Sequence, residues 1–112
     1  MFAVQNAMDV TNVLRTLADP TRRAMFERIV EAGEITAGAL AQNATVSQPA
    51  VSQHLRALRE AKLITERREG KYIHYRAEPR GLAPMVDWLS HYGAFWRSRF
   101  AVLEKVLLEI DR

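Results

Sequence analysis

The sequence has no cysteine among its 112 residues. Disulfide bonds, thiolate metal sites and thiol-based redox sensing are therefore excluded. No apolar run approaches the roughly 18 residues that a membrane-spanning helix requires. The first fourteen residues lack the basic start and the long apolar run of a signal peptide. A Gly-rich phosphate-binding loop is also missing. These absences predict an intracellular protein of the cytoplasm that makes no contact with a membrane.

Excess positive charge is confined to one segment of the chain. The net charge is +3, from 16 Lys and Arg against 13 Asp and Glu. Residues 45–81 hold eight basic and four acidic side chains, whereas residues 1–44 hold four and five, and residues 82–112 hold four of each. Many charge clusters are simply solvated surface. A confined excess is also the electrostatic footprint of a site that binds a polyanion.

The basic segment begins with an amphipathic helix that has a polar outer face. Ser47 is its predicted N-cap, and Pro49 lies in the first turn, where a missing N–H is tolerated. Val51, Leu55 and Leu58 form one apolar stripe at helical spacing. The opposite face carries small, amide and charged side chains, namely Pro49, Ser52, Gln53, Arg56, Ala57 and Glu60. Amides pair with adenine and Arg with guanine, so this face is suited to reading base edges.

The predicted helices and strands around this segment form a helix-turn-helix followed by a β-hairpin. Helices are predicted over about 9–18, from Asp19-Pro20 to near Gly33, and from Thr36 to around Asn43. Two helices joined by three or four residues, the second with a polar outer face, form a helix-turn-helix. Strands are predicted over 63–68 and 71–77, with Glu69-Gly70 as the turn. The basic side chains of this hairpin are placed to reach phosphates, and His74 is predicted to be exposed.

A last long helix is predicted over 82–110, with Gly93 as a position where it can bend. Its apolar stripe consists of Leu89, Tyr92, Trp96, Leu103, Val106 and Ile110. A chain of this length has little core left to cover so broad a face, and a partner helix from a second subunit is the economical solution. The aromatic set Trp88, Tyr92, Phe95, Trp96 and Phe100 also allows a pocket for a small apolar ligand, although aromatics at this spacing more often form core or interface.

These motifs resemble the arsenic-repressor-type (ArsR-like) family of bacterial winged helix-turn-helix transcriptional regulators. The resemblance is carried by residues 17–23 (LADPTRR), 47–55 (SQPAVSQHL), 58–61 (LREA) and 68–71 (REGK). It implies a mainly α fold with a small β-hairpin, and a single domain over residues 1–112 whose terminal helices, at about 9–18 and 82–110, make a homodimer. It further implies a repressor that occupies an operator on double-stranded DNA at the nucleoid. Family positions that read DNA fall on Gln48, Ser52 and Gln53.

The residues and the resemblance together define a predicted DNA-binding set. It consists of Ser47, Gln48, Pro49, Ser52, Gln53, His54, Arg56, Arg67, Arg68 and Lys71. His54 lies on the flank of its helix, where either a DNA phosphate or a neighbouring backbone group is a reasonable partner. No histidine has a nucleophile or carboxylate at a spacing that suggests a catalytic pair. We therefore predict a protein that is not an enzyme and has no cofactor.

Metal sensing is not expected. Metal-sensing members of the family use Cys in the third helix or a set of Asp, His and Glu in the last helix. Residues 36–42 offer no ligand, and in the last helix Asp87 and His91 lie four apart, with Glu104 and Glu109 well downstream. A zinc site across a dimer needs three or four convergent ligands. The sequence thus predicts a repressor that does not respond to metals. It does not define the operator or any effector.

Two other functions are compatible with the same pattern. One is a repressor that a small apolar ligand releases at the dimer interface. The other is a winged-helix module that holds a protein partner, since this fold serves both purposes. A protein-binding version should carry apolar side chains where Gln48, Ser52, Gln53 and Arg56 stand. Because these positions are polar, DNA binding is favoured.

Overall fold

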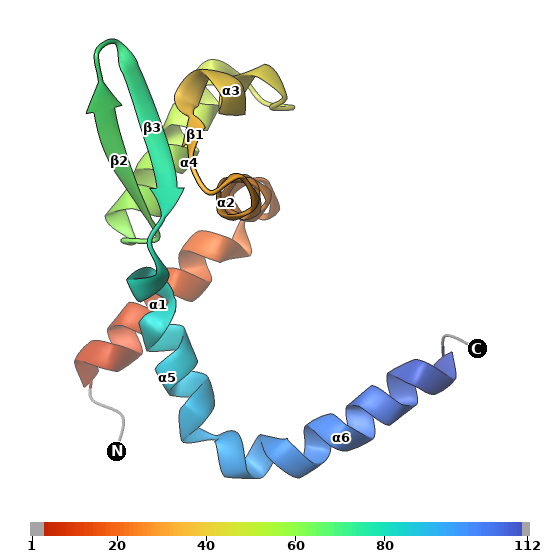
Figure 1. Ribbon diagram of the computed structural model, residues 1–112. Coiled ribbons are helices and arrows are strands. Elements are labelled where there is room, and N and C mark those ends of the chain that lie inside the picture. The colour runs from red at the N-terminus through yellow and green to blue at the C-terminus, as the bar shows by residue number, and fades with distance from the viewer. Residues whose placement is uncertain (1–3, 111–112) are drawn as a thin grey trace.

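The chain folds as a series of helices interrupted by a small antiparallel sheet (Figure 1). The computed structural model describes residues 4–110, apart from the side chains of residues 4–8, Ala94 and Trp96. In chain order the elements are α1 (Val4–Ala18), α2 (Pro20–Ala32), β1 (Ile35–Thr36), α3 (Ala37–Gln42), α4 (Gln48–Glu60), β2 (Ile64–Glu69), β3 (Tyr72–Ala77), the 3-10 helix η1 (Pro79–Leu82), α5 (Ala83–His91) and α6 (Gly93–Ile110). The winged helix-turn-helix fold predicted from the sequence is confirmed.

Side-chain caps fix the starts of the helices that surround the turn. The Asp19 carboxylate accepts from the Arg22 backbone N–H at 3.1 Å, and the Thr36 hydroxyl accepts from that of Ala39 at 3.1 Å. The Ser47 hydroxyl accepts from the backbone N–H of Ala50 at 3.3 Å. Each bond satisfies an N–H that has no partner within its helix, which is why short polar residues mark these boundaries in the sequence.

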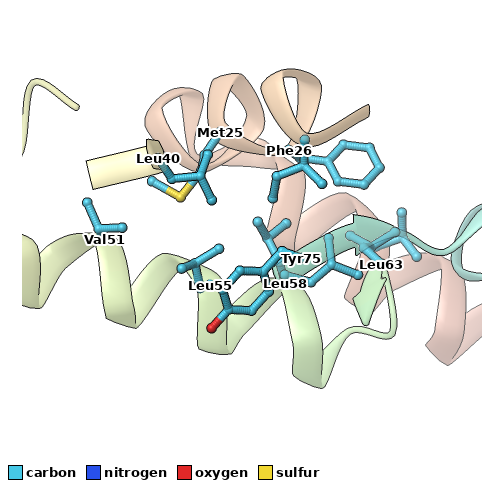
Figure 2. Close-up of a cluster of buried hydrophobic side chains, with 11 residues drawn as sticks. Met25, Phe26, Leu40, Val51, Leu55, Leu58, Leu63 and Tyr75 are labelled. Atoms are coloured by element: carbon cyan, nitrogen blue, oxygen red, sulfur yellow. The ribbon is translucent and has the colours of Figure 1, made fainter. Parts of the chain in front are cut away.

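The core lies between α2, α4 and the sheet. Figure 2 shows Met25 and Phe26 of α2 on one side of the cluster and the α4 stripe of Val51, Leu55 and Leu58 on the other. Ile29, Leu40, Leu58, Leu63 and Ile64 are fully buried. The apolar stripe predicted for α4 is therefore confirmed, and its burial turns the opposite face of the helix outward.

The sheet has one strand more than the sequence predicted. Its order is β1-β3-β2, with Ile35 opposite Tyr75 and Arg68 opposite Ile73. The hairpin was expected, but β1 spans only two residues and therefore has no alternation that a pattern could reveal. By pairing with Tyr75 and His74 in the middle of β3, β1 joins the hairpin to the start of α3.

The terminal helices differ from the prediction in extent. α1 begins at Val4 rather than near Asp9, and the helix expected over 82–110 is divided into α5 and α6. The break falls at Tyr92, where a backbone bond from its N–H to Leu89 closes α5, and Gly93 follows with its low helix propensity. Figure 1 shows α5 crossing α1 and α6 turning away from the rest of the molecule. The radius of gyration is 17.1 Å, against about 13 Å for a compact chain of this length.

A close backbone approach joins the end of α4 to the start of the C-terminal helices. Lys62 has φ = 64°, and the N–H groups of Lys62 and Leu63 donate to the carbonyls of Arg59 and Leu58. This pair of bonds is a Schellman motif, in which the left-handed residue is usually Gly. Gly81 packs so closely that an added Cβ would lie 2.2 Å from the Lys62 carbonyl oxygen. The position of α5 is thus tied to the end of α4.

Candidate nucleic-acid interface

The outward face of α4 gathers most of the predicted DNA-binding residues. Ser47, Gln48, Pro49, Ser52, Gln53 and Arg56 are all exposed. Apart from the Ser47 cap, the side chains of this group form one ion pair with the described residues, a loose contact of 3.8 Å between Arg56 and Glu60, whose side chains are each 73% exposed. The side chains of Gln48, Ser52 and Gln53 make no hydrogen bond with any described residue, so their donors and acceptors are available to another molecule.

An open groove separates this face from the hairpin. It has a volume of about 490 Å³ and runs between α3, α4 and β3. Ala37, Gly38 and Ala41 form the α3 side, Ser52 and Arg56 belong to the α4 side, and Ile73 and Tyr75 belong to β3. The small residues of α3 leave the groove open, and on the α4 side polar side chains line it together with the apolar Val51 and Leu55.

The hairpin offers two kinds of arginine, which the sequence could not distinguish. The Arg67 guanidinium is held by Glu34 from the loop before β1 and by Glu69, the latter at 2.8 Å. Arg68 and Lys71 are exposed and have no carboxylate partner among residues 4–110. Lys71 lies 5.5 Å from the centre of the Tyr72 ring. Of the predicted hairpin cations, Arg68 and Lys71 are therefore the ones free to meet a phosphate.

Charge pairing perturbs the titration of the groups around Arg67. Its hydrogen bond lowers the pKa of both Glu34 and Glu69 below their ordinary value of 4.5. The same bonds, first to Glu69 and then to Glu34, raise the pKa of Arg67. On the core side of the hairpin, burial raises the pKa of the Tyr75 hydroxyl. The contacts among Glu34, Arg67 and Glu69 thus stabilise the charged forms of all three side chains at neutral pH. They also connect the hairpin to the loop before β1.

The structure gives two histidines surroundings other than those expected. His54 was expected to face a phosphate or a neighbouring backbone group, but its Nδ1 accepts from Nε of Arg22 at 3.3 Å. The prediction that His74 is exposed was wrong, because its side chain is only 22% exposed. His74 lies between two carboxylates, with Nδ1 3.4 Å from Glu34 and Nε2 3.7 Å from Glu69.

The sequence analysis did not identify Arg22 as a partner of His54 or Glu34 as a partner of Arg67. Glu34 lies 33 residues before Arg67 and has no local pattern that marks it. Arg22 did carry a signal, because it follows the Asp19 cap directly after the end of α1, where basic side chains often bond the last carbonyls of a helix. Its NH1 does donate to the Thr16 carbonyl at 3.3 Å.

The predicted dimer residues lie on exposed surface. Leu89, Tyr92, Leu103, Val106 and Ile110 are 43–71% exposed, and the side chain of Trp96 lies outside the described residues. Leu107, Phe95 and Phe100 widen the same apolar surface. Within the described part of the chain, no three His, Asp or Glu side chains gather in a way that could hold a metal ion. None of its helices is long and apolar enough to cross a bilayer.

Comparison with known proteins identifies the family. A helix-turn-helix domain model matches residues 17–67. The transcriptional repressor SdpR of Bacillus subtilis is 31% identical over 74% of this chain and 91% of its own length. The HTH-type transcriptional regulator Rv2034 of Mycobacterium tuberculosis is 45% identical over 70% and 72%.

A solved structure agrees with these relatives. The ArsR-like transcriptional regulator from Rhodococcus sp. RHA1 is 28% identical, superposes with a TM-score of 0.73, and matches 92% of this chain and 96% of its own. The outward polar face of α4, the basic hairpin and these similarities lead to one conclusion. The chain belongs to the ArsR-type family of winged helix-turn-helix transcriptional regulators, which are DNA-binding proteins and not enzymes.

Proposed function

We propose that the protein is a homodimeric repressor that inserts α4 of each subunit into the major groove of an inverted-repeat operator. One observation carries this proposal: the exposed face of α4 presents Gln48, Ser52 and Gln53 with no partner among residues 4–110. Polar side chains on a rigid helix, free of internal bonds, are what direct reading of base edges requires. A surface built to hold a protein partner would be apolar at these positions.

The two elements of the interface have different roles in this proposal. Gln48, Ser52 and Gln53 on α4 read bases, and Arg56 adds a cation on the same face. Arg68 and Lys71 on the hairpin bind phosphates and supply affinity that does not depend on sequence. Arg67 acts indirectly, because its bonds to Glu34 and Glu69 hold the hairpin in place.

The dimer is formed by α6 and α5 with help from α1, and residues 1–112 act as one DNA-binding unit at the nucleoid. The exposed apolar surface of α5 and α6 supports this, because monomers rarely leave so large a continuous patch in water. A dyad then places two copies of α4 in successive major grooves, roughly 34 Å apart. The regulator uses no metal, since the last helix provides too few ligands, and any effector is an unidentified small molecule.

The test distinguishes base contacts made by α4 from phosphate contacts made by the hairpin. DNA from upstream of the protein's own gene is footprinted, and the protected duplex is compared with a scrambled duplex by fluorescence anisotropy across a salt series. We expect Gln53→Ala to weaken operator binding by about 1–3 kcal/mol and to leave scrambled-DNA binding and the salt slope nearly intact. Gln42→Ala, which removes an exposed amide from α3 instead, is the matched control and should change neither affinity.

Hairpin variants should behave in the opposite way. Arg68→Ala or Lys71→Ala should weaken both duplexes alike and flatten the log–log salt dependence by about 0.9 for each phosphate that the variant no longer neutralises. If Gln53→Ala lowers both affinities equally while Arg68→Ala removes only the preference for the operator, the roles assigned to the two elements are reversed.

A further inference from the structure

Arg22 lies where three helices meet. Its backbone N–H donates to the Asp19 cap of α2 at 3.1 Å, and its NH1 donates to the Thr16 carbonyl of α1 at 3.3 Å. Its Nε donates to Nδ1 of His54, on α4, at 3.3 Å. One side chain therefore connects the end of α1, which belongs to the proposed dimer region, to the helix proposed to read DNA.

The adjacent arginine provides a natural comparison. Arg23 also donates to an α1 carbonyl, that of Leu17, at 2.8 Å, but it is exposed and makes no hydrogen bond to α4 within residues 4–110. Both arginines thus cap the C-terminal end of α1, where cations are favourable. What distinguishes Arg22 is its bond to His54.

The bond between Arg22 and His54 requires a particular protonation state. A guanidinium only donates, so Nδ1 of His54 must carry a lone pair, which only the neutral imidazole has. Protonation converts Nδ1 into a donor and sets a cation against a cation. Arg22 and the carboxylate of Asp19 face His54 from the α1–α2 junction, while its neighbours three and four residues away along α4 are apolar (Ala50, Val51, Ala57 and Leu58).

We propose that Arg22 and His54 are positioning residues that fix α4 relative to α1, so that operator reading requires neutral His54. The proposal rests on the proposed role of α4 in reading DNA. It replaces the expectation that His54 contacts a phosphate. Breaking the link frees α4 to shift against α1, so the two copies of α4 in a dimer no longer match the spacing of the operator grooves.

The two roles for His54 predict pH effects of opposite sign. As a phosphate contact, His54 gains a charge on protonation and binds both operator and scrambled DNA more tightly in acid. As an acceptor for Arg22, it loses its bond on protonation and the preference for the operator falls in acid. His54→Gln separates the roles, since its amide oxygen can accept from Arg22 at every pH.

The experiment measures operator and scrambled-DNA affinity for four proteins between about pH 8 and pH 5.5, the range in which histidines generally ionise. The proteins are the wild type, His54→Gln, Arg22→Gln and Arg23→Gln, each checked by circular dichroism at every pH. The duplexes are the footprinted operator and its scrambled counterpart. The other histidines are common to all four proteins, so their titration cancels when the profiles are compared.

We expect the operator preference of the wild type to fall about fivefold or more in acid relative to His54→Gln. At the alkaline end we expect Arg22→Gln to lose about tenfold in operator preference, whereas Arg23→Gln keeps it. Superimposable profiles for the wild type and His54→Gln would overturn the proposal, and so would binding to both duplexes that tightens in acid more for the wild type than for His54→Gln. The wild-type and His54→Gln comparison decides the matter even if Arg22→Gln does not fold.

Gln53→Ala in the same assay shows which idea has failed. If it keeps full operator preference, Gln53 does not read the operator, and the role that the proposed function gives to this residue is wrong. If it loses that preference while the His54 profiles coincide, α4 reads DNA and only the link to Arg22 is refuted.

Discussion

At the scale of single residues, Lys62 is held in a backbone conformation that lysine rarely adopts. Its φ of 64° places it in the left-handed region, where a Cβ costs roughly 1–2 kcal/mol. Lys62→Gly removes that cost and adds some freedom to the unfolded chain. We expect a net stabilisation of about 0.5–1 kcal/mol in urea unfolding, measured at equal protein concentration.

Lys62→Ala is the control for this prediction. It removes the same charge and the same alkyl chain but keeps the Cβ, so the strain at φ = 64° persists. Alanine should give no gain over the wild type. If alanine stabilises the protein as much as glycine does, the side chain of Lys62 and not its backbone conformation is the source of the cost.

Single residues also show which structural roles could be predicted from nearby sequence and which could not. Asp19, Thr36 and Ser47 were predictable as caps, because the cap and the N–H it satisfies lie three residues apart. Arg67 and Arg68 were indistinguishable, because the partner that separates them, Glu34, comes from a distant loop. The DNA-reading roles of Gln48, Ser52 and Gln53 stay predictions that the operator assay will decide.

At the scale of elements, the hairpin depends on carboxylates remaining charged. The pKa values of Glu34 and Glu69 are lowered in the folded protein, chiefly by the hydrogen bond from Arg67. Groups with a depressed folded pKa stabilise the fold above their unfolded pKa and lose that contribution as pH falls through the folded value. The contribution should therefore be complete well above pH 4.5 and disappear progressively below it.

This prediction is tested by thermal unfolding of the wild type and Glu34→Gln. The variant should melt at a lower temperature near neutral pH, and the difference should shrink in acid, where the wild-type carboxylate is protonated as well. Glu31→Gln, which removes an exposed carboxylate of α2 that forms no ion pair within residues 4–110, is the matched control. A difference between wild type and Glu34→Gln that persists unchanged in acid would mean that the ion pairs do not hold the hairpin.

Helices and strands were predictable where the apolar pattern extended over many residues and capping or turn residues marked the ends. α2 and α4 follow from a cap, a proline and an apolar stripe, and the hairpin follows from alternation around Gly70. β1 was missed because two residues have no period. One helix was expected over 82–110, with a possible bend at Gly93, and the structure instead ends α5 at His91 and begins α6 at Gly93. The apolar residues on both sides of Tyr92 keep helical spacing, so their pattern does not reveal that the helix is interrupted there.

At the scale of the whole molecule, α6 should make the dimer. Leu103 is 51% exposed within the apolar stripe, and Leu108 is 64% exposed about 140° around the helix from Leu103. We expect Leu103→Asp to give monomers at micromolar concentration in sedimentation velocity, since it places a charge in the proposed interface. Leu108→Asp is the matched control and should remain dimeric. A dimeric Leu103→Asp protein would refute the assignment of this stripe to the interface.

Operator binding should not respond to transition metals. The described residues hold no cluster of three His, Asp or Glu side chains suited to a metal ion. Operator affinity measured with EDTA, and then with added zinc, cadmium or arsenite, should agree within about tenfold, the change that corresponds to 1.4 kcal/mol of coupling. A larger change that His91→Ala abolishes would establish a metal site on α5.

The position of α6 outside the main body has a consequence for how activity depends on the amount of protein. The described side chains from Phe95 to Ile110 are all exposed, so this helix adds little to the stability of an isolated chain. In the proposed dimer its contribution arises by mass action and grows with protein concentration. At concentrations where most chains are monomers, doubling the number of chains would then raise the number of dimers up to fourfold. Occupancy of the operator would therefore respond to gene dosage more steeply than linearly.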